Sequence, residues 1–136
     1  MSKINHGFTL IEMMIVVAII AIIAAWGYSS YRDTVLRSRR AEGVGELLEI
    51  ADRMERYYSS QGTYIGATLG TSASAVHSVS SENGYYNFAI TAANAVQFTV
   101  TATPQGGQAD DTKCGTFTLN SLGTRSASGT TPDKCW

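Results

Sequence analysis

The sequence contains few of the residues from which catalytic and metal sites are built. Its histidines are His6 and His77, and its cysteines, Cys114 and Cys135, are too few and too far apart for a zinc site of the usual spacing. One histidine among many serines does not make a catalytic triad. The sequence also has no glycine-rich phosphate-binding motif and no cluster of metal ligands. We therefore expect no enzymatic activity, no cofactor and no bound metal.

Charge is also scarce, because only 15% of the residues are charged and the formal net charge is −1. This balance indicates neither a general nucleic-acid binder nor an acidic tail. The distribution is uneven: residues 13–31 carry no charge, and residues 32–56 carry twelve charges. The cluster of Arg32, Arg37, Arg39 and Arg40 follows the uncharged stretch directly, whereas from residue 41 onward nine acidic residues stand against five basic ones. The distal part of the chain is therefore acidic.

The uncharged stretch lies within a longer apolar run, residues 8–28. A helix of this length would measure about 31 Å, which is enough to cross the hydrocarbon core of a bilayer. A soluble domain in a chain of 136 residues is too small to surround a helix that is apolar on every face, so we predict a membrane-spanning segment. Because Gly7 precedes the run, cleavage there would leave the apolar segment in the mature protein, unlike cleavage of a secretory signal peptide.

Residues 31–58 continue the helix with a different character. Apolar residues recur close to the 3.6-residue helical period, and we expect one stripe of them to contact the rest of the fold: Val44, Leu48, Ala51 and Met54. On the opposite face, Glu49 with Arg53 and Asp52 with Arg56 have the i,i+4 spacing of favourable ion pairs. The sequence thus predicts one helix of about fifty residues, apolar all round at first and amphipathic later.

Three later segments, residues 86–90, 96–102 and 117–119, alternate apolar with polar or small residues. This period-two pattern is typical of strands with one buried and one wet face. We expect a hairpin turn at residues 92–95, and a polar loop that opens with Pro104, Gly106 and Gly107 before the third strand. The Ser-, Thr- and Gly-rich segments, residues 59–84 and 125–133, are predicted to be loops. These expectations give an α+β fold, a long N-terminal helix packed on a small antiparallel β-sheet.

Cys114 and Cys135 lie near the C-terminus of a chain with a membrane-targeting N-terminal segment, which favours one disulfide formed outside the cytoplasm. Two free buried thiols are the alternative. A disulfide here would close a loop of 22 residues and stabilise the fold by about 3 kcal/mol on the chain-entropy model. The loop would either serve as a structural staple or present a surface for recognition, and the sequence favours neither role.

The stretch Gly7-Phe8-Thr9-Leu10-Ile11-Glu12, followed by the apolar helix, resembles the processing and assembly motif of type IV pilins and pseudopilins, in the short-leader class. The segments RMERYY (residues 53–58), CGTFTLN (114–120) and DKCW (133–136) look most like PilE-type minor pilins. The resemblance implies the type IV pilin fold with its C-terminal disulfide loop. It also implies that a prepilin peptidase cleaves after Gly7 and that Phe8 becomes N-methylphenylalanine.

Glu12 is a single carboxylate within the apolar run. Such a residue costs about 2.5–3.5 kcal/mol on membrane insertion scales and usually has a functional partner. The alternative is a residue at the membrane edge that reaches the interface, helped by the positive end of the helix. The resemblance implies that Glu12 meets the Phe8 amine of a neighbouring subunit, so that neutralising both charges sets the axial register of assembly.

The sequence departs from the pattern of many pilins at two positions, since Ser29 stands where proline is common and Ala21 where glycine is common. Those residues are associated with a helix segment that loosens in the filament, and here Gly27 is the weak point. The arginine cluster after the apolar run also departs from the rule that positive residues mark the cytoplasmic side. We follow the family orientation, in which the N-terminus is cytoplasmic.

The resulting division is a leader at residues 1–7, a transmembrane and filament-core helix at 8–29, an amphipathic helix at 30–59 and a globular head at 60–136. We expect a structural subunit of a bacterial type IV pilus, a minor pilin that supports assembly, twitching motility, adhesion or DNA uptake. Its partners would be other pilins, the prepilin peptidase, the inner-membrane assembly machinery and membrane lipid. It would be a single-pass inner-membrane protein before assembly and extracellular afterwards.

Two other functions remain open. One is a DNA-receptor pilin, which is less favoured than a structural subunit. Neutralising DNA phosphates needs basic residues, and Lys113, Arg125 and Lys134 are the only ones beyond the helix. A pseudopilin of a type II secretion system is disfavoured by the C-terminal cysteine pair.

Overall fold

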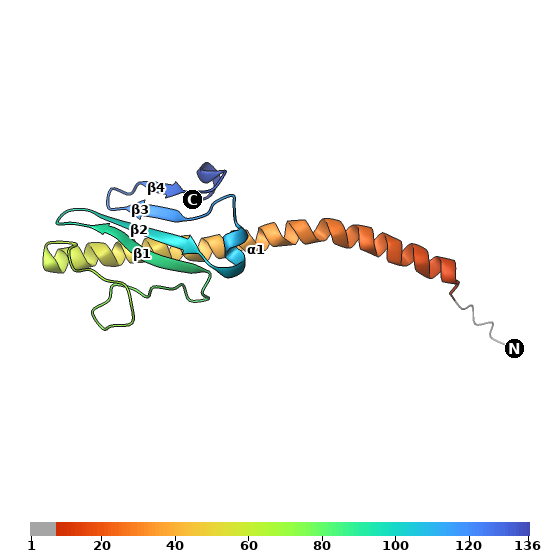
Figure 1. The fold of residues 1–136 in the computed structure, drawn as a ribbon, viewed down its shortest axis with the longest axis horizontal. Coiled ribbons are helices and arrows are strands. Elements are labelled where there is room, and N and C mark those ends of the chain that lie inside the picture. The colour runs from red at the N-terminus through yellow and green to blue at the C-terminus, as the bar shows by residue number, and fades with distance from the viewer. Residues whose placement is uncertain (1–7) are drawn as a thin grey trace. The chain divides into compact units, whose positions relative to one another are not determined.

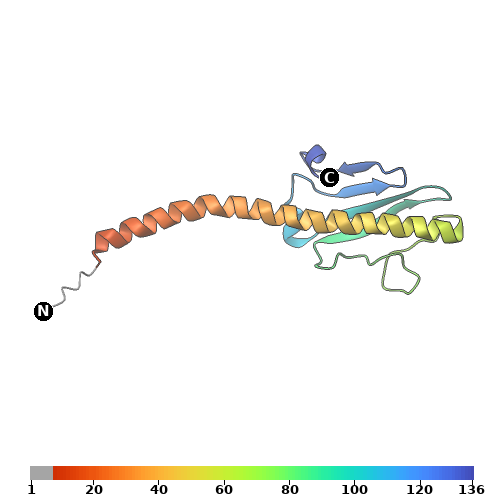
Figure 2. The same cartoon turned by 180° about the vertical axis from the view of Figure 1, so that it is seen from behind.

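The computed structural model describes residues 8–136, apart from the side chain of Ser29. It consists of one long helix, α1, and a four-stranded sheet with two short 3-10 helices, and their bounds are α1 Leu10–Gln61, β1 Tyr86–Ala93, β2 Phe98–Pro104, η1 Gly106–Asp110, β3 Phe117–Asn120, β4 Arg125–Ala127 and η2 Pro132–Lys134. The chain forms two compact units that divide between Val35 and Leu36. Within the second unit, the sheet lies against one side of the C-terminal half of α1 (Figures 1 and 2). The predicted α+β architecture is confirmed.

Both ends of α1 follow from local sequence. The Glu12 backbone N–H donates a hydrogen bond to Thr9 Oγ1 at 3.3 Å, which caps the first turn. Thr9 and Glu12 have the spacing of a capping box. At the other end Gly62 adopts a left-handed φ of +71°, and its N–H bonds to the Tyr58 carbonyl at 2.7 Å. Between these ends the helix is continuous through Gly27.

The face of α1 that packs on the sheet differs from the predicted one. Leu47, Ile50 and Met54 are fully buried, whereas Leu48 is 38% exposed, so its assignment to the core was wrong. Val44 and Ala51 are only partly buried at the edge of the core. The observed stripe is rotated about the helix axis, relative to the predicted one, by less than the angle of about 100° between successive residues.

Gly43 explains this choice of face. A Cβ at Gly43 would lie 2.5 Å from Cδ2 of the buried Tyr86 ring, so only glycine allows the first residue of β1 to approach the helix this closely. Continuing from Gly43 at helical spacing leads to Leu47, Ile50 and Met54. Across from them the sheet contributes the buried side chains of Tyr86, Phe88, Phe98, Val100, Phe117 and Leu119.

The sheet is antiparallel with strand order β1-β2-β3-β4. β1 continues into the expected turn as far as Ala93, with an irregularity between Ile90 and Ala92. The turn itself is built on Asn94, whose Oδ1 accepts hydrogen bonds from the N–H groups of Val96 and Gln97 at 2.9 and 2.8 Å. Val96 therefore belongs to the turn and is 66% exposed, contrary to its predicted place in a strand.

β4 lies in a segment that was predicted to be a loop. Its residues Arg125–Ala127 pair with β3, and two of the three are exposed. Asn120 Oδ1 accepts hydrogen bonds from the N–H groups of Leu122 and Thr124, and this turn directs the chain back along β3. A short edge strand with exposed side chains has no apolar alternation, so no sequence pattern indicates it.

The connection between α1 and β1 is held to the helix by two carboxylates. Glu46 Oε1 accepts the Glu82 N–H at 3.0 Å, and Glu42 accepts hydrogen bonds from the backbone and side-chain nitrogens of Asn83. The connection also contributes Tyr64 and Val76 to the core, and an isolated bridge joins Leu69 to His77. It is thus an ordered part of the head.

Candidate functional site

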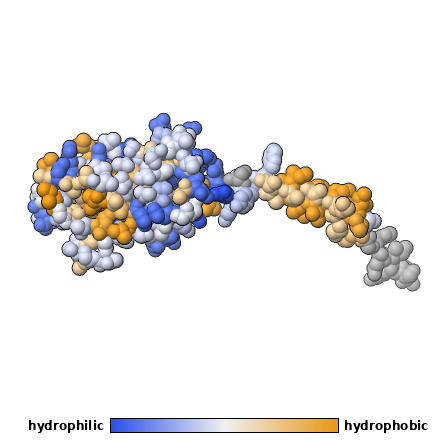
Figure 3. Space-filling view, viewed as in Figure 1, coloured by the Kyte–Doolittle hydropathy of each residue, from blue (hydrophilic) through white to orange (hydrophobic). Residues whose placement is uncertain are grey.

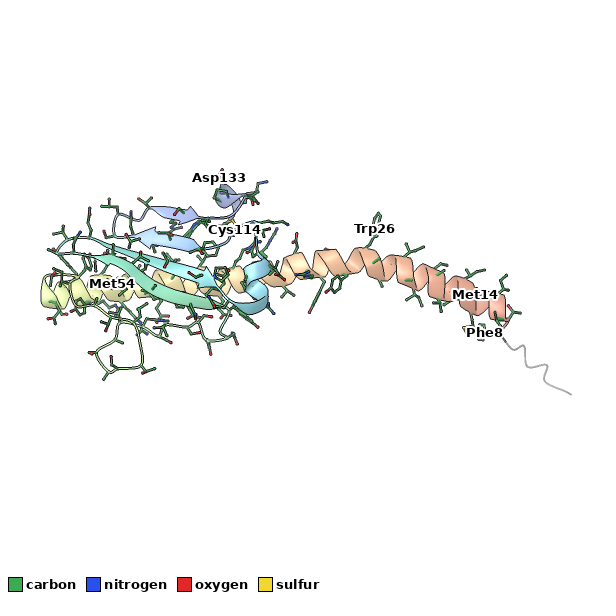
Figure 4. All side chains as sticks on the ribbon, in the orientation of Figure 1. Phe8, Met14, Trp26, Met54, Cys114 and Asp133 are labelled. Atoms are coloured by element: carbon green, nitrogen blue, oxygen red, sulfur yellow. A yellow bond between two sulfur atoms is a disulfide. The ribbon has the colours of Figure 1, made fainter. Side chains whose placement is uncertain are left out.

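The N-terminal half of α1 presents a largely hydrophobic surface on the face seen in Figure 3. Its most apolar window of 18 residues has a mean hydropathy of 2.5, and none of that window is buried against other parts of the described chain. Met14 and Trp26 project outward from this half of the helix (Figure 4). By length and composition, α1 is the one helix among residues 8–136 that could span a membrane. A core helix of a soluble domain would be mostly covered, and this segment is not.

The predicted site residues of the N-terminal segment fall partly inside the structure. Gly7 lies outside the described residues. Phe8 precedes the helix and is 75% exposed. Glu12 lies in the first turn of α1, and its carboxylate makes no ion pair within the described part of the chain. Because the cap uses the Glu12 backbone N–H, the carboxylate stays available for a partner outside the chain.

Three aromatic residues that no sequence motif singles out mark the other end of the apolar segment. Trp26, Tyr28 and Tyr31 are 83%, 67% and 69% exposed. Sixteen residues separate Leu10 from Trp26, a rise of about 24 Å along the helix. Trp and Tyr are enriched at membrane interfaces, so their position supports an interfacial girdle at the end of the span that is farther from Glu12.

In the second unit, a disulfide joins Cys114 and Cys135, whose Cα atoms are 5.6 Å apart. Both cysteines are buried, and the bridge ties the C-terminal segment to the residues that precede β3. Cys114 is labelled in Figure 4 beside the sheet. Next to it, Trp136 packs edge-on against Phe117 with ring centroids 5.4 Å apart. The C-terminal segment is thus fixed to the core by the disulfide and by the Trp136 ring.

A buried ion pair secures the same region to α1. Arg40 binds both carboxylate oxygens of Asp111, with Nη2–Oδ1 at 2.6 Å, and the Asp111 side chain is 1% exposed. Asp111 Oδ1 also accepts the Cys114 N–H at 3.3 Å. The pair therefore links α1 directly to the first cysteine of the bridge. Seventy-one residues separate the two partners, and no local pattern in the sequence signals their contact.

Gln108 extends this network towards β1. Its Nε2 donates hydrogen bonds to Tyr86 Oη at 3.0 Å and to the Leu36 carbonyl at 3.2 Å. Burial, more than any neighbouring charge, raises the pKa of Tyr86 to about 12. These contacts join η1 to β1 and to α1 and so stabilise the head.

Comparison with known proteins gives two family matches. The family described as type IV minor pilin ComP, DNA uptake sequence receptor, matches residues 29–118. The prokaryotic N-terminal methylation motif matches residues 2–28. Together the two matches cover both halves of α1 and most of the sheet.

Two of the similar proteins, FimA and PilV, agree with these families. The chain is 48% identical over 59 residues to the type IV major fimbrial protein FimA of Dichelobacter nodosus, a match that covers 40% of this chain and 37% of that protein. Among solved structures, the non-core minor pilin PilV of Neisseria meningitidis matches with a TM-score of 0.56 and 32% identity, over 71% of this chain and 90% of that one. A type IV pilin from Shewanella oneidensis matches with a TM-score of 0.49 and 29% identity, over 74% and 97% of the two chains.

Proposed function

Because the chain belongs to the type IV pilin family, we propose that it is a subunit of a bacterial type IV pilus, assembled through the N-terminal half of α1. Before assembly it is a single-pass protein of the inner membrane with its N-terminus in the cytoplasm. After assembly it is part of the extracellular filament. The match of residues 29–118 to a minor pilin family supports the role of a minor pilin. Its partners are other pilins and the inner-membrane assembly machinery.

The observation that carries this proposal is the uncovered apolar half of α1. Nothing else in the described chain buries its most apolar window, although the same helix continues into a well-packed core at Leu47 and Ile50. An apolar surface of this extent needs lipid or protein around it. A membrane supplies lipid before assembly, and the packed helices of neighbouring subunits supply protein afterwards.

Processing at Gly7 and Phe8 is part of the proposal. The N-terminal methylation motif covers both residues, and the peptidase of this family is the expected enzyme. Mass spectrometry of filament-derived protein should find a chain that begins with N-methylated Phe8. An assembled chain that still carries Met1 would contradict the proposal.

Glu12 is proposed to pair with the Phe8 amine of the preceding subunit. Phe8 and Glu12 are four positions apart, or about 6 Å along the helix. A pairing between copies therefore displaces the second copy along the helix by roughly that distance, give or take the length of the side chains. A buried charge with its partner removed is strongly destabilising, so loss of either partner should block assembly.

The test compares Glu12→Gln, which removes the charge, with Glu12→Asp, which keeps it. Both variants should insert into the membrane, as shown by fractionation, because neither adds charge to the span. Filament incorporation should be lost in the glutamine variant and partly retained in the aspartate variant. Normal incorporation of the glutamine variant would contradict the register role of Glu12.

Reception of DNA is a second candidate, favoured by the match to a family described as a DNA uptake sequence receptor. Binding of labelled duplex DNA to the detergent-solubilised chain at 50 and 200 mM salt would test it. A receptor should lose affinity steeply as salt rises, and should prefer one duplex sequence over a scrambled control. Equal, weak binding to both duplexes would leave the structural role as the function.

A further inference from the structure

Two grooves of opposite charge flank α1 in the head. The first, of about 480 Å³, lies between the helix and the C-terminal segment, and its lining includes Arg37, Arg40, Ala41, Val44, Lys134 and Trp136. The second, of about 440 Å³, lies between the helix and the connection to β1, and its lining includes Glu46, Glu49, His77 and Glu82. We call them the basic groove and the acidic groove.

Each groove keeps charge after its internal pairs are counted. In the basic groove Arg40 is engaged by Asp111, but Arg37 and Lys134 are exposed and have no ion-pair partner among residues 8–136. In the acidic groove Glu49 pairs with Arg53. Glu46 accepts a neutral backbone N–H from Glu82, and the Glu82 side chain is exposed. The basic groove is therefore net positive and the acidic groove net negative.

The grooves lie on opposite flanks of one helix. The buried stripe of Leu47, Ile50 and Met54 is the reference direction around the helix, at 100° per residue. The basic groove, at positions 37–44, lies about 100° to one side of this stripe. The acidic groove, at positions 46 and 49, lies about 100° to the other side. One copy of the chain thus presents complementary charge on its two sides. A contact that joins different surfaces of identical subunits is heterologous, and it builds an open helical assembly when it does not close into a ring.

We propose that the basic groove of one copy receives the acidic groove of a second copy, with Arg37 facing Glu82 and Lys134 facing Glu46. This inference rests on the proposed function, since it names the partner and the surface of a filament subunit. The basic positions precede the acidic ones by about two helical turns, so the second copy is displaced along α1 by about 10 Å.

The direction of this displacement agrees with that of the proposed N-terminal pair. The Phe8 amine precedes Glu12 along the chain, as the basic groove precedes the acidic groove. Both pairings therefore require the copy that contributes the carboxylates to move in the same direction along its helix. The two displacements along the helix have the same direction, and they measure about 6 Å and about 10 Å.

The test uses the detergent-solubilised full chain as a mixture of unlabelled and ¹⁵N-labelled copies, because a bilayer would hold both apolar segments at one depth and oppose the displacement. A carbodiimide joins Lys134 to a carboxylate without adding a spacer, and mass spectrometry of mixed-isotope peptides identifies links between copies. We expect links from Lys134 to Glu82 or Glu46, with a yield that falls at least ~5-fold when 0.5 M salt screens the charges.

Arg37→Glu should lower the yield of these links at least ~5-fold, although Arg37 takes no part in the coupling reaction. Arg56→Glu is the matched control, because Arg56 is exposed, lines neither groove and undergoes the same charge change. Arg37→Glu combined with Glu82→Lys exchanges the charges of one facing pair and should restore the link from Lys134 to Glu46. A merely structural role for Arg37 would not allow that rescue.

Links confined to single copies, or links between copies that ignore Arg37→Glu, would overturn the proposal. It would also be overturned if Arg37→Glu weakened binding of duplex DNA and left the links unchanged, because the basic groove would then serve nucleic acid. If the chain enters filaments but forms no such links, this inference fails and the proposed function stands. If the links form in detergent but the chain never enters filaments, the proposed function fails.

Discussion

Replacing Leu47 by alanine should destabilise the head far more than the same change at the adjacent Leu48. Leu47 is fully buried in the core, so the change leaves a cavity and should lower the free energy of unfolding by about 2–5 kcal/mol. Leu48 is 38% exposed at the edge of the helix and should lose about 1 kcal/mol or less. For a head of this size, each kcal/mol corresponds to about 4–8 °C in Tm.

Thermal melts followed by near-UV circular dichroism would measure both changes, in a fragment of residues 31–136 and in the detergent-solubilised full chain. Glu49→Ala is the control for the loss of a helix-surface side chain. Its ion pair with Arg53 is exposed, so the change should lower stability by well under 1 kcal/mol. Equal Tm shifts for Leu47→Ala and Leu48→Ala would show that the buried face of α1 is wrongly assigned here.

Three further changes test the packing of the head. Gly43→Ala should lower stability by about 1–3 kcal/mol because its methyl group would overlap the Tyr86 ring, whereas Gly45→Ala, with nothing within 4 Å, should be neutral or stabilising in the same melts. The pKa of Tyr86 is about 12 in the fold, against 10 in the unfolded chain. The neutral side chain therefore contributes its full stability below pH 10, and this contribution is lost as pH rises through 12. Tyr86→Phe should flatten the fall in Tm between pH 9 and pH 12. Reducing the Cys114–Cys135 bond should lower stability by about 3 kcal/mol, and an unchanged Tm after verified reduction would contradict that estimate.

Features set by local composition or short-range periodicity could be read from the sequence. The apolar run of residues 8–28 has no polar face in any helical register, so it predicts an uncovered helix whatever the rest of the chain does. Alternation at Tyr86 and Phe88 in β1, and at Phe117 and Leu119 in β3, identified buried strand faces for a similar reason. In a strand, successive side chains point to opposite sides, so one register decides which are buried.

Tertiary contacts decided what remained. Neighbouring apolar stripes on α1 differ by less than one residue step, and the close approach of Tyr86 to Gly43 selects the stripe with Leu47 over the one with Leu48. The Arg40–Asp111 pair and the two charged grooves bring together residues far apart in the chain. A charged residue looks the same in sequence whether it is solvated or paired, because its partner is chosen by the fold. The sequence by itself therefore determined the membrane segment, the strand faces and the α+β class, and only the packed head determined which side of the helix is covered and where its charges meet.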